Sequence, residues 1–146
     1  MREHDATTYW EAWELDRPGH SLLHSSYLYP VAWYVSNVLG IQRDAEVVAF
    51  KKFTIRPPKV DATDLTFARG AYRSVVGEIK SSWEKKPTGF ELSIVVPPNT
   101  SATVYVPKSL ENGKIEAPRG AKFVGDVDGF AVFEVPSGSF FFKESK

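Results

Sequence analysis

The chain has 146 residues, and its 18 basic and 18 acidic side chains balance, which argues against nucleic acid as the main partner because phosphate binding usually requires a basic excess. The absence of cysteine excludes disulfides and thiolate metal sites, and it leaves the compartment of the protein unknown, whether inside the cell or outside it. No apolar run is long enough to span a bilayer and none follows the charged N-terminus, so we expect neither a membrane partner nor a signal peptide in this chain.

Aromatic side chains crowd the first 34 residues, where three of the four tryptophans lie. Residues 1–20 have the composition of a loop, and from Ser21 to about Leu39 apolar residues recur at helical spacing. Pro30 fits the first turn of the regular helix, and Gly40 stands where a C-cap glycine belongs. A helix that is apolar on most sides cannot bury itself alone. We therefore expect it to pack on other helices or on the rest of this chain, and we expect the aromatic side chains either to pack in the same way or to line a site.

After Arg43 the apolar pattern changes to the period of two that is typical of strands. We expect strands at Val47–Ile55, Gly77–Lys85, Phe90–Val96, Ala102–Val106, Lys114–Ala117, Lys122–Asp126, Phe130–Val135 and Ser139–Lys143. Asp128-Gly129 and Ser137-Gly138 are dipeptides typical of hairpin turns. About eight short strands at this spacing predict a mainly β fold, an antiparallel β-sandwich preceded by a loop and one or two helices. The predicted division is residues 1–43 and 44–146.

Three stretches in a fixed order carry more specific motifs. They are Ala6-Thr7-Thr8-Tyr9-Trp10-Glu11-Ala12-Trp13, then Ser21-Leu22-Leu23-His24 with its aromatic helix, then Phe50-Lys51-Lys52-Phe53-Thr54-Ile55-Arg56-Pro57 with Val96-Pro97-Pro98-Asn99-Thr100. Together they resemble the C-terminal end of bacterial α-L-rhamnosidases, glycoside hydrolase family 78. The resemblance implies that residues 1–43 are the end of an (α/α)6 catalytic barrel and that residues 44–146 are the C-terminal β-sandwich domain.

The resemblance also implies an active-site role for the first motif. Inverting hydrolysis needs one carboxyl group to protonate the leaving oxygen and a second to deprotonate a water. By the resemblance Glu11 is the general base, and His24, Trp10 and Trp13 bind the substrate. Indole rings would exclude water, raise the proton affinity of the carboxylate and offer flat faces to a 6-deoxy sugar. The family's general acid lies upstream, and no segment of this chain resembles it.

Simpler interpretations of these residues stay open. A glutamate between two tryptophans is also typical of a solvated residue, and Glu14 is a rival carboxylate. His4 and His20 are interpreted as structural, and the three histidines lack acidic residues at ligand spacing, so we expect no metal site and no cofactor. Asn99-Thr100-Ser101 fits a glycosylation pattern, but we interpret it as a turn.

Three functions are compatible with this pattern. The first is the C-terminal part of an α-L-rhamnosidase, with a rhamnose-containing glycoside and an upstream helical barrel as partners and no activity when isolated. The second is a carbohydrate-binding sandwich, which needs exposed aromatics on a sheet face. We interpret Trp83 and Phe140-Phe141-Phe142 instead as core or sheet-packing residues. The third is a module that only stabilises the barrel, which predicts an exposed apolar patch on residues 9–34.

Overall fold

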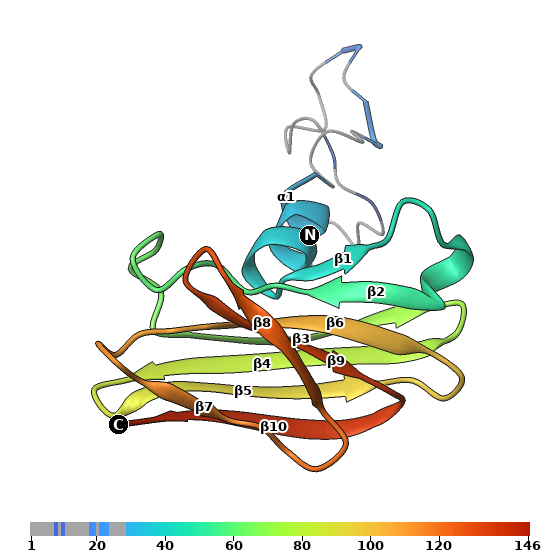
Figure 1. Cartoon of the computed structure of the whole chain (residues 1–146). Coiled ribbons are helices and arrows are strands. Elements are labelled where there is room, and N and C mark those ends of the chain that lie inside the picture. Colours follow the sequence, from blue (N-terminus) through green and yellow to red (C-terminus); the bar gives the residue numbers. More distant parts are fainter. Residues whose placement is uncertain (1–7, 9, 11–17, 20, 24–28) are drawn as a thin grey trace. The chain divides into compact units, whose positions relative to one another are not determined.

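A computed structural model of the chain describes residues 8, 10, 18–19, 21–23 and 29–146 (Figure 1). The chain divides into two compact units, Met1–Tyr34 and Val35–Lys146. All the strands formed by the described residues belong to the second unit. The predicted boundary between a barrel remnant and a sandwich domain, at residues 43 and 44, stays a prediction, because compactness does not say which residues belong to a barrel.

The predicted helix begins and ends where its proline and glycine indicate. Helix α1 (Tyr29–Trp33) runs directly into the π-helical turn η3 (Tyr34–Val38), and Pro30 lies in the first turn. Gly40 has a φ of 76°, the left-handed conformation that commonly ends helices. A Cβ at Gly40 would collide with the backbone of Arg56, whose N–H donates to the Gly40 carbonyl at 2.8 Å. Residues 21–23 are not helical, and residues 24–28 lie outside the described part of the chain.

Two five-stranded sheets form the sandwich, so the predicted mainly β fold is confirmed. The strands are β1 (Ile41–Arg43), β2 (Lys52–Ile55), β3 (Phe67–Ser74), β4 (Gly77–Lys86), β5 (Gly89–Val96), β6 (Ser101–Pro107), β7 (Lys114–Glu116), β8 (Lys122–Val127), β9 (Phe130–Val135) and β10 (Gly138–Ser145). The sheet orders are β1-β2-β6-β9-β8 and β3-β4-β5-β10-β7 (Figure 1). Neighbouring strands are antiparallel except β2 and β6, which are parallel.

The core lies between the inner faces of the two sheets, and strand alternation determines its members. Ile79, Ser81 and Trp83 of β4 are all buried, as the alternation predicts. On β5 the buried positions are also alternate ones, from Phe90 to Val96. The rings of Trp83 and Phe90 stack with their centroids 5.7 Å apart. A stacked aromatic pair of this kind adds to the free energy gained by burying its apolar surface.

Three expectations about the strands were wrong or incomplete. The predicted strand Val47–Ile55 is regular only over β2, because Val48–Phe50 form a 3-10 turn (η4) in which Ala49 and Phe50 have φ values of 62° and 59°. Strands β1 and β3 were not predicted. Ser137-Gly138 does not close a hairpin, because β9 and β10 belong to different sheets and this dipeptide carries the chain between them.

Two turn predictions are confirmed. Asp128 and Gly129 have φ values of 51° and 82° and join β8 to β9, as expected for a type I′ hairpin. Asn99 has a φ of 61°, and the buried Thr100 donates its hydroxyl to the Pro97 carbonyl at 2.7 Å. The Asn99-Thr100-Ser101 segment is therefore the turn that we expected between β5 and β6.

The end of the helical segment is hydrogen-bonded to the inner face of β4. Trp83 Nε1 donates to the Val38 carbonyl at 2.7 Å, and Ser81 Oγ donates to the Leu39 carbonyl at 2.8 Å. The last carbonyls of a helix have no partner within the helix, so these side chains satisfy buried acceptors that would otherwise be unpaired.

We expect Ser81→Ala to lower the free energy of unfolding by about 1–3 kcal/mol, because the buried Leu39 carbonyl loses its donor. Ser82→Ala is the matched control, since the neighbouring Ser82 lies on the opposite face of β4. Urea denaturation of both variants measures the difference. Equal stability of the two variants would contradict the role assigned to the Ser81 hydroxyl.

Candidate functional site

The predicted site residues fall mostly outside the described part of the chain. Glu11, Trp13 and His24 lie there, as do the rival Glu14 and the histidines interpreted as structural, His4 and His20. Trp10 is described and is half-buried. The roles predicted for Glu11, His24, Trp10 and Trp13 therefore stay predictions.

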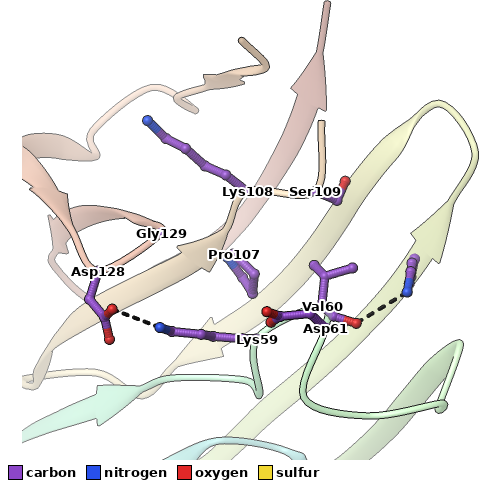
Figure 2. A pocket seen from close by; sticks show the side chains of 9 residues that line it. Lys59, Val60, Asp61, Pro107, Lys108, Ser109, Asp128 and Gly129 are labelled. Atoms are coloured by element: carbon purple, nitrogen blue, oxygen red, sulfur yellow. Dashed lines mark hydrogen bonds and ion pairs between the residues drawn. The ribbon is translucent and has the colours of Figure 1, made fainter. Parts of the chain in front are cut away.

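Within the second unit, a polar groove lies where several loops converge (Figure 2). It has a volume of about 600 Å³. Its lining residues come from the segment after β2, the strand β4, the end of β6 with the loop that follows, and the β8–β9 turn: Lys59, Val60, Asp61, Lys85, Pro107, Lys108, Ser109, Asp128 and Gly129. The groove was not predicted, because the segments that line it are far apart in the sequence. None of these segments carries a motif that distinguishes it from an ordinary surface segment.

The groove is held by interactions of its charged side chains. Lys59 Nζ lies 2.7 Å from Asp128 Oδ1, the contact drawn in Figure 2. Lys85 Nζ donates to the Val60 carbonyl at 3.1 Å, and Lys108 Nζ lies 2.7 Å from Asp126 Oδ2. Each lysine of the groove thus has a partner, so the groove offers polar contacts without an unpaired excess of positive charge.

The β8–β9 turn is further fixed by an arginine. The Arg56 guanidinium lies 5.0 Å from the ring centroid of Tyr105 and 4.9 Å from that of Phe130, and 3.8 Å from Asp128 Oδ2. The hydrogen bond from Lys59 is the main cause that holds the pKa of the Asp128 carboxyl below its ordinary value of 3.8, and the charges of Lys59 and Arg56 act in the same direction.

A buried carboxylate lies behind the groove. Glu144 is 1% exposed and accepts hydrogen bonds from the backbone N–H groups of Phe90 (3.0 Å), Ser109 (2.9 Å) and Leu110 (2.9 Å), and from the Ser109 hydroxyl. A Cβ at Gly113 would collide with this carboxylate. Because the Ser109 hydroxyl is already donated to Glu144, Ser109 serves to anchor its loop.

The sequence did carry a signal for the burial of Glu144. It follows Phe140 and Phe142 at a spacing of two, so strand alternation places all three on the inner face, and all three are buried. Phe140 and Phe142 are core residues as interpreted, whereas Phe141 between them is 50% exposed, so that part of the interpretation was wrong.

The described residues form neither a metal-binding cluster nor a membrane-spanning helix. Among them, no group of three histidine, cysteine, aspartate or glutamate side chains could hold a metal ion. In the same part of the chain, none of the helices has the length and apolar character needed to cross a bilayer. What the groove offers is a set of hydrogen-bonding groups held in place by ion pairs.

Comparison with known proteins shows the family to which this sandwich belongs. Residues 40–121 match the family described as "Bacterial alpha-L-rhamnosidase C-terminal domain". A curated alpha-L-rhamnosidase of Streptomyces avermitilis is 32% identical over 142 residues, which are 92% of this chain and 13% of that protein. The chain therefore spans only a small part of the length of this relative.

Two solved structures show the same likeness. One is a crystal structure of Streptomyces avermitilis alpha-L-rhamnosidase complexed with L-rhamnose, with a TM-score of 0.71 and 30% identity over 97% of this chain and 14% of that chain. The other is an alpha-L-rhamnosidase from Dictyoglumus thermophilum, with a TM-score of 0.75 and 29% identity over 100% of this chain and 17% of that chain.

We expect Glu144→Ala to lower the free energy of unfolding by about 3 kcal/mol, because the buried Phe90 N–H and three part-buried donors of Ser109 and Leu110 lose their acceptor. Glu134→Ala is the control, since the Glu134 side chain is 52% exposed and lies 3.9 Å from Lys122 Nζ. Chemical denaturation compares the two variants. A Glu144→Ala protein as stable as the control would rule out the anchoring role.

The charge of Asp128 should stabilise the protein in a pH-dependent way. Because its pKa is lower in the folded state, the contribution is complete above the unfolded-state pKa and is lost as the pH falls through the folded-state pKa. Asp128→Asn removes the charge and keeps a residue that tolerates the positive φ of this turn. We expect a lower Tm than wild type at pH 7 and a smaller difference at pH 3, measured by thermal unfolding. A Tm difference that is independent of pH would contradict this account.

Proposed function

The chain belongs to the family of bacterial α-L-rhamnosidase C-terminal domains, and on this basis we propose that it is the C-terminal part of an inverting α-L-rhamnosidase that releases terminal non-reducing α-L-rhamnose from glycosides. One observation carries the proposal. Alignments that span 92–100% of this chain span only 13–17% of the related enzymes. A chain of this extent supplies one portion of such an enzyme, and the remaining catalytic groups come from outside it.

In this proposal Glu11 is the general base. Its carboxylate accepts a proton from a water on the face of the sugar opposite the leaving group, while a carboxylic acid from the upstream barrel protonates the glycosidic oxygen. In inverting enzymes the two carboxyl groups lie roughly 6.5–9.5 Å apart to leave room for this water. Trp10 and Trp13 exclude bulk water around Glu11 and provide apolar surface for the methyl group of rhamnose, and His24 hydrogen-bonds the ring hydroxyls.

The proposed barrel remnant, residues 1–43, would pack on the upstream helices. Helix α1 has no buried residue. Six large apolar side chains of the described residues before position 35 are 39–71% exposed: Leu22, Leu23, Tyr29, Val31, Trp33 and Tyr34. Exposed apolar side chains that form a contiguous patch commonly mark an interaction site, and the number of such side chains in this short segment supports a helical partner for it.

The isolated 146-residue chain should not hydrolyse an aryl α-L-rhamnoside, because the proposed general acid lies outside it. The measurement is release of the aryl group by the wild-type chain and by Glu11→Gln. Turnover by the wild-type chain above that of Glu11→Gln would mean that the isolated chain contains a complete site.

A chimeric enzyme tests the role of Glu11 directly. This chain replaces the aligned C-terminal segment of the Streptomyces avermitilis enzyme, with which it shares 32% identity over 142 residues. We expect Glu11→Gln in the chimera to lower kcat by about 10²–10⁴-fold, the usual contribution of a general base. Binding of L-rhamnose, measured by calorimetry, should persist, because the amide keeps the shape of the carboxylate.

Glu14→Gln is the matched control, since it changes the rival carboxylate of the same motif. The chimera carrying it should keep its kcat. Loss of activity in Glu14→Gln together with full activity in Glu11→Gln would transfer the role of the base to Glu14.

A further inference from the structure

The outer face of the β3-β4-β5-β10-β7 sheet carries an unusual row of side chains. By strand register, Arg69 pairs with Ser82, Ser82 with Ser93, and Ser93 with Phe141, so the four residues form one row across four neighbouring strands. Figure 1 shows these strands side by side. With strands about 4.7–4.9 Å apart, the row is roughly 14 Å long. One end is an aromatic ring, the middle is two hydroxyls, and the other end is a guanidinium.

The two short serine side chains leave a depression beside the phenylalanine. This depression has a volume of about 370 Å³, and its outward-facing lining includes Lys80, Ser82, Ser93, Val95, Ser139 and Phe141. Within the described part of the chain, the hydroxyls of Ser82, Ser93 and Ser139 have no protein hydrogen-bond partner. Phe141 is 50% exposed. The depression therefore combines an accessible aromatic ring with free hydroxyls.

Two lysines of this face form ion pairs with glutamates of the same face. Lys80 Nζ lies 3.0 Å from Glu78 Oε2, and Lys86 Nζ lies 2.5 Å from Glu91 Oε2 and 3.4 Å from Glu84 Oε2. The Arg69 guanidinium lies 5.8 Å from the ring centroid of Phe67. Arg69, Arg73 and Lys143 of the same face have no carboxylate partner within the described part of the chain. The depression itself is lined by one charged side chain, Lys80, which is paired with Glu78, so the chemistry of the depression favours a neutral ligand.

We propose that this face, centred on Phe141, Ser82 and Ser93, binds a neutral saccharide separately from any catalytic site. The C–H face of a pyranose is apolar and carries a slight positive charge, which suits the negative face of the Phe141 ring. Sugar hydroxyls both donate and accept hydrogen bonds, as do the unpartnered serine hydroxyls. The site contains none of the residues proposed for catalysis, so it goes beyond the proposed function.

A protein partner fits this surface less well. The centres of protein–protein interfaces are depleted in lysine, glutamate and serine. Lysine and serine, two of these residue types, line the depression beside Phe141, at Lys80, Ser82, Ser93 and Ser139. The composition of the face thus favours a saccharide over a protein surface.

The test is a titration of the isotope-labelled chain with the neutral disaccharide rutinose, which contains α-L-rhamnose, followed residue by residue by NMR. We expect the largest shift changes at Ser82, Ser93 and Phe141. Phe141→Ala should weaken the binding about tenfold, because the ring supplies the apolar contact. Ser93→Val, which fills the depression with a residue that favours strands, should weaken it similarly.

Phe123→Ala is the matched control, since Phe123 is 55% exposed and lies on β8 in the other sheet. It should bind rutinose as the wild type does. The readout at this face is independent of Glu11, so failure here leaves the proposed hydrolase role untouched. The proposal is wrong if rutinose shifts no resonance of this face, or if Phe141→Ala binds it normally. Self-association of the wild-type chain that Phe141→Ala abolishes, without saccharide shifts, would instead make the face a protein-docking surface.

Discussion

Burial of the Glu144 carboxylate is the constraint on which one end of the sandwich depends. A carboxylate away from water is costly unless donors surround it, and here backbone N–H groups of β5 and of the loop after β6 supply them together with the Ser109 hydroxyl. The interaction connects the end of β10 to the start of β5 and to Ser109 and Leu110. It thereby holds the loop that forms one wall of the polar groove, and it leaves no room for a side chain at Gly113.

A second set of buried hydrogen bonds performs the same task at the start of the unit. The carbonyls of Val38 and Leu39 are satisfied by side chains of β4, and the Leu39 side chain packs so closely on Gly70 that a Cβ there would lie 2.6 Å from Leu39 Cδ1. The last turn of the helical segment is therefore a fixed part of the sandwich unit. The chain leaves this unit towards its N-terminus from a defined position.

The proposed functions belong to different parts of the chain. The proposed catalytic base belongs to the N-terminal segment, and the sandwich provides a rigid frame with two surfaces of different chemistry. In the groove the lysines are paired with carboxylates or a carbonyl, which suits a role in fixing loops. On the outer face of the other sheet, hydroxyls remain unpartnered beside an exposed ring, which suits a ligand.

The sequence by itself determined the strands that have one buried face, because alternation is a local property: the inward residues of β4 and β5 follow from it, as does the turn at Asp128-Gly129. The motifs in a fixed order also indicated the family, and they predict Glu11 as the catalytic base. The edge strand β3 was missed because most of its side chains are not buried and show no apolar alternation. Only the tertiary structure decided that Ser137-Gly138 crosses between sheets, that Glu144 is satisfied by donors far away in the sequence, and that Phe141 adjoins two free serines. Each of these depends on which strands become neighbours, and strand pairing is set by burial of the whole core.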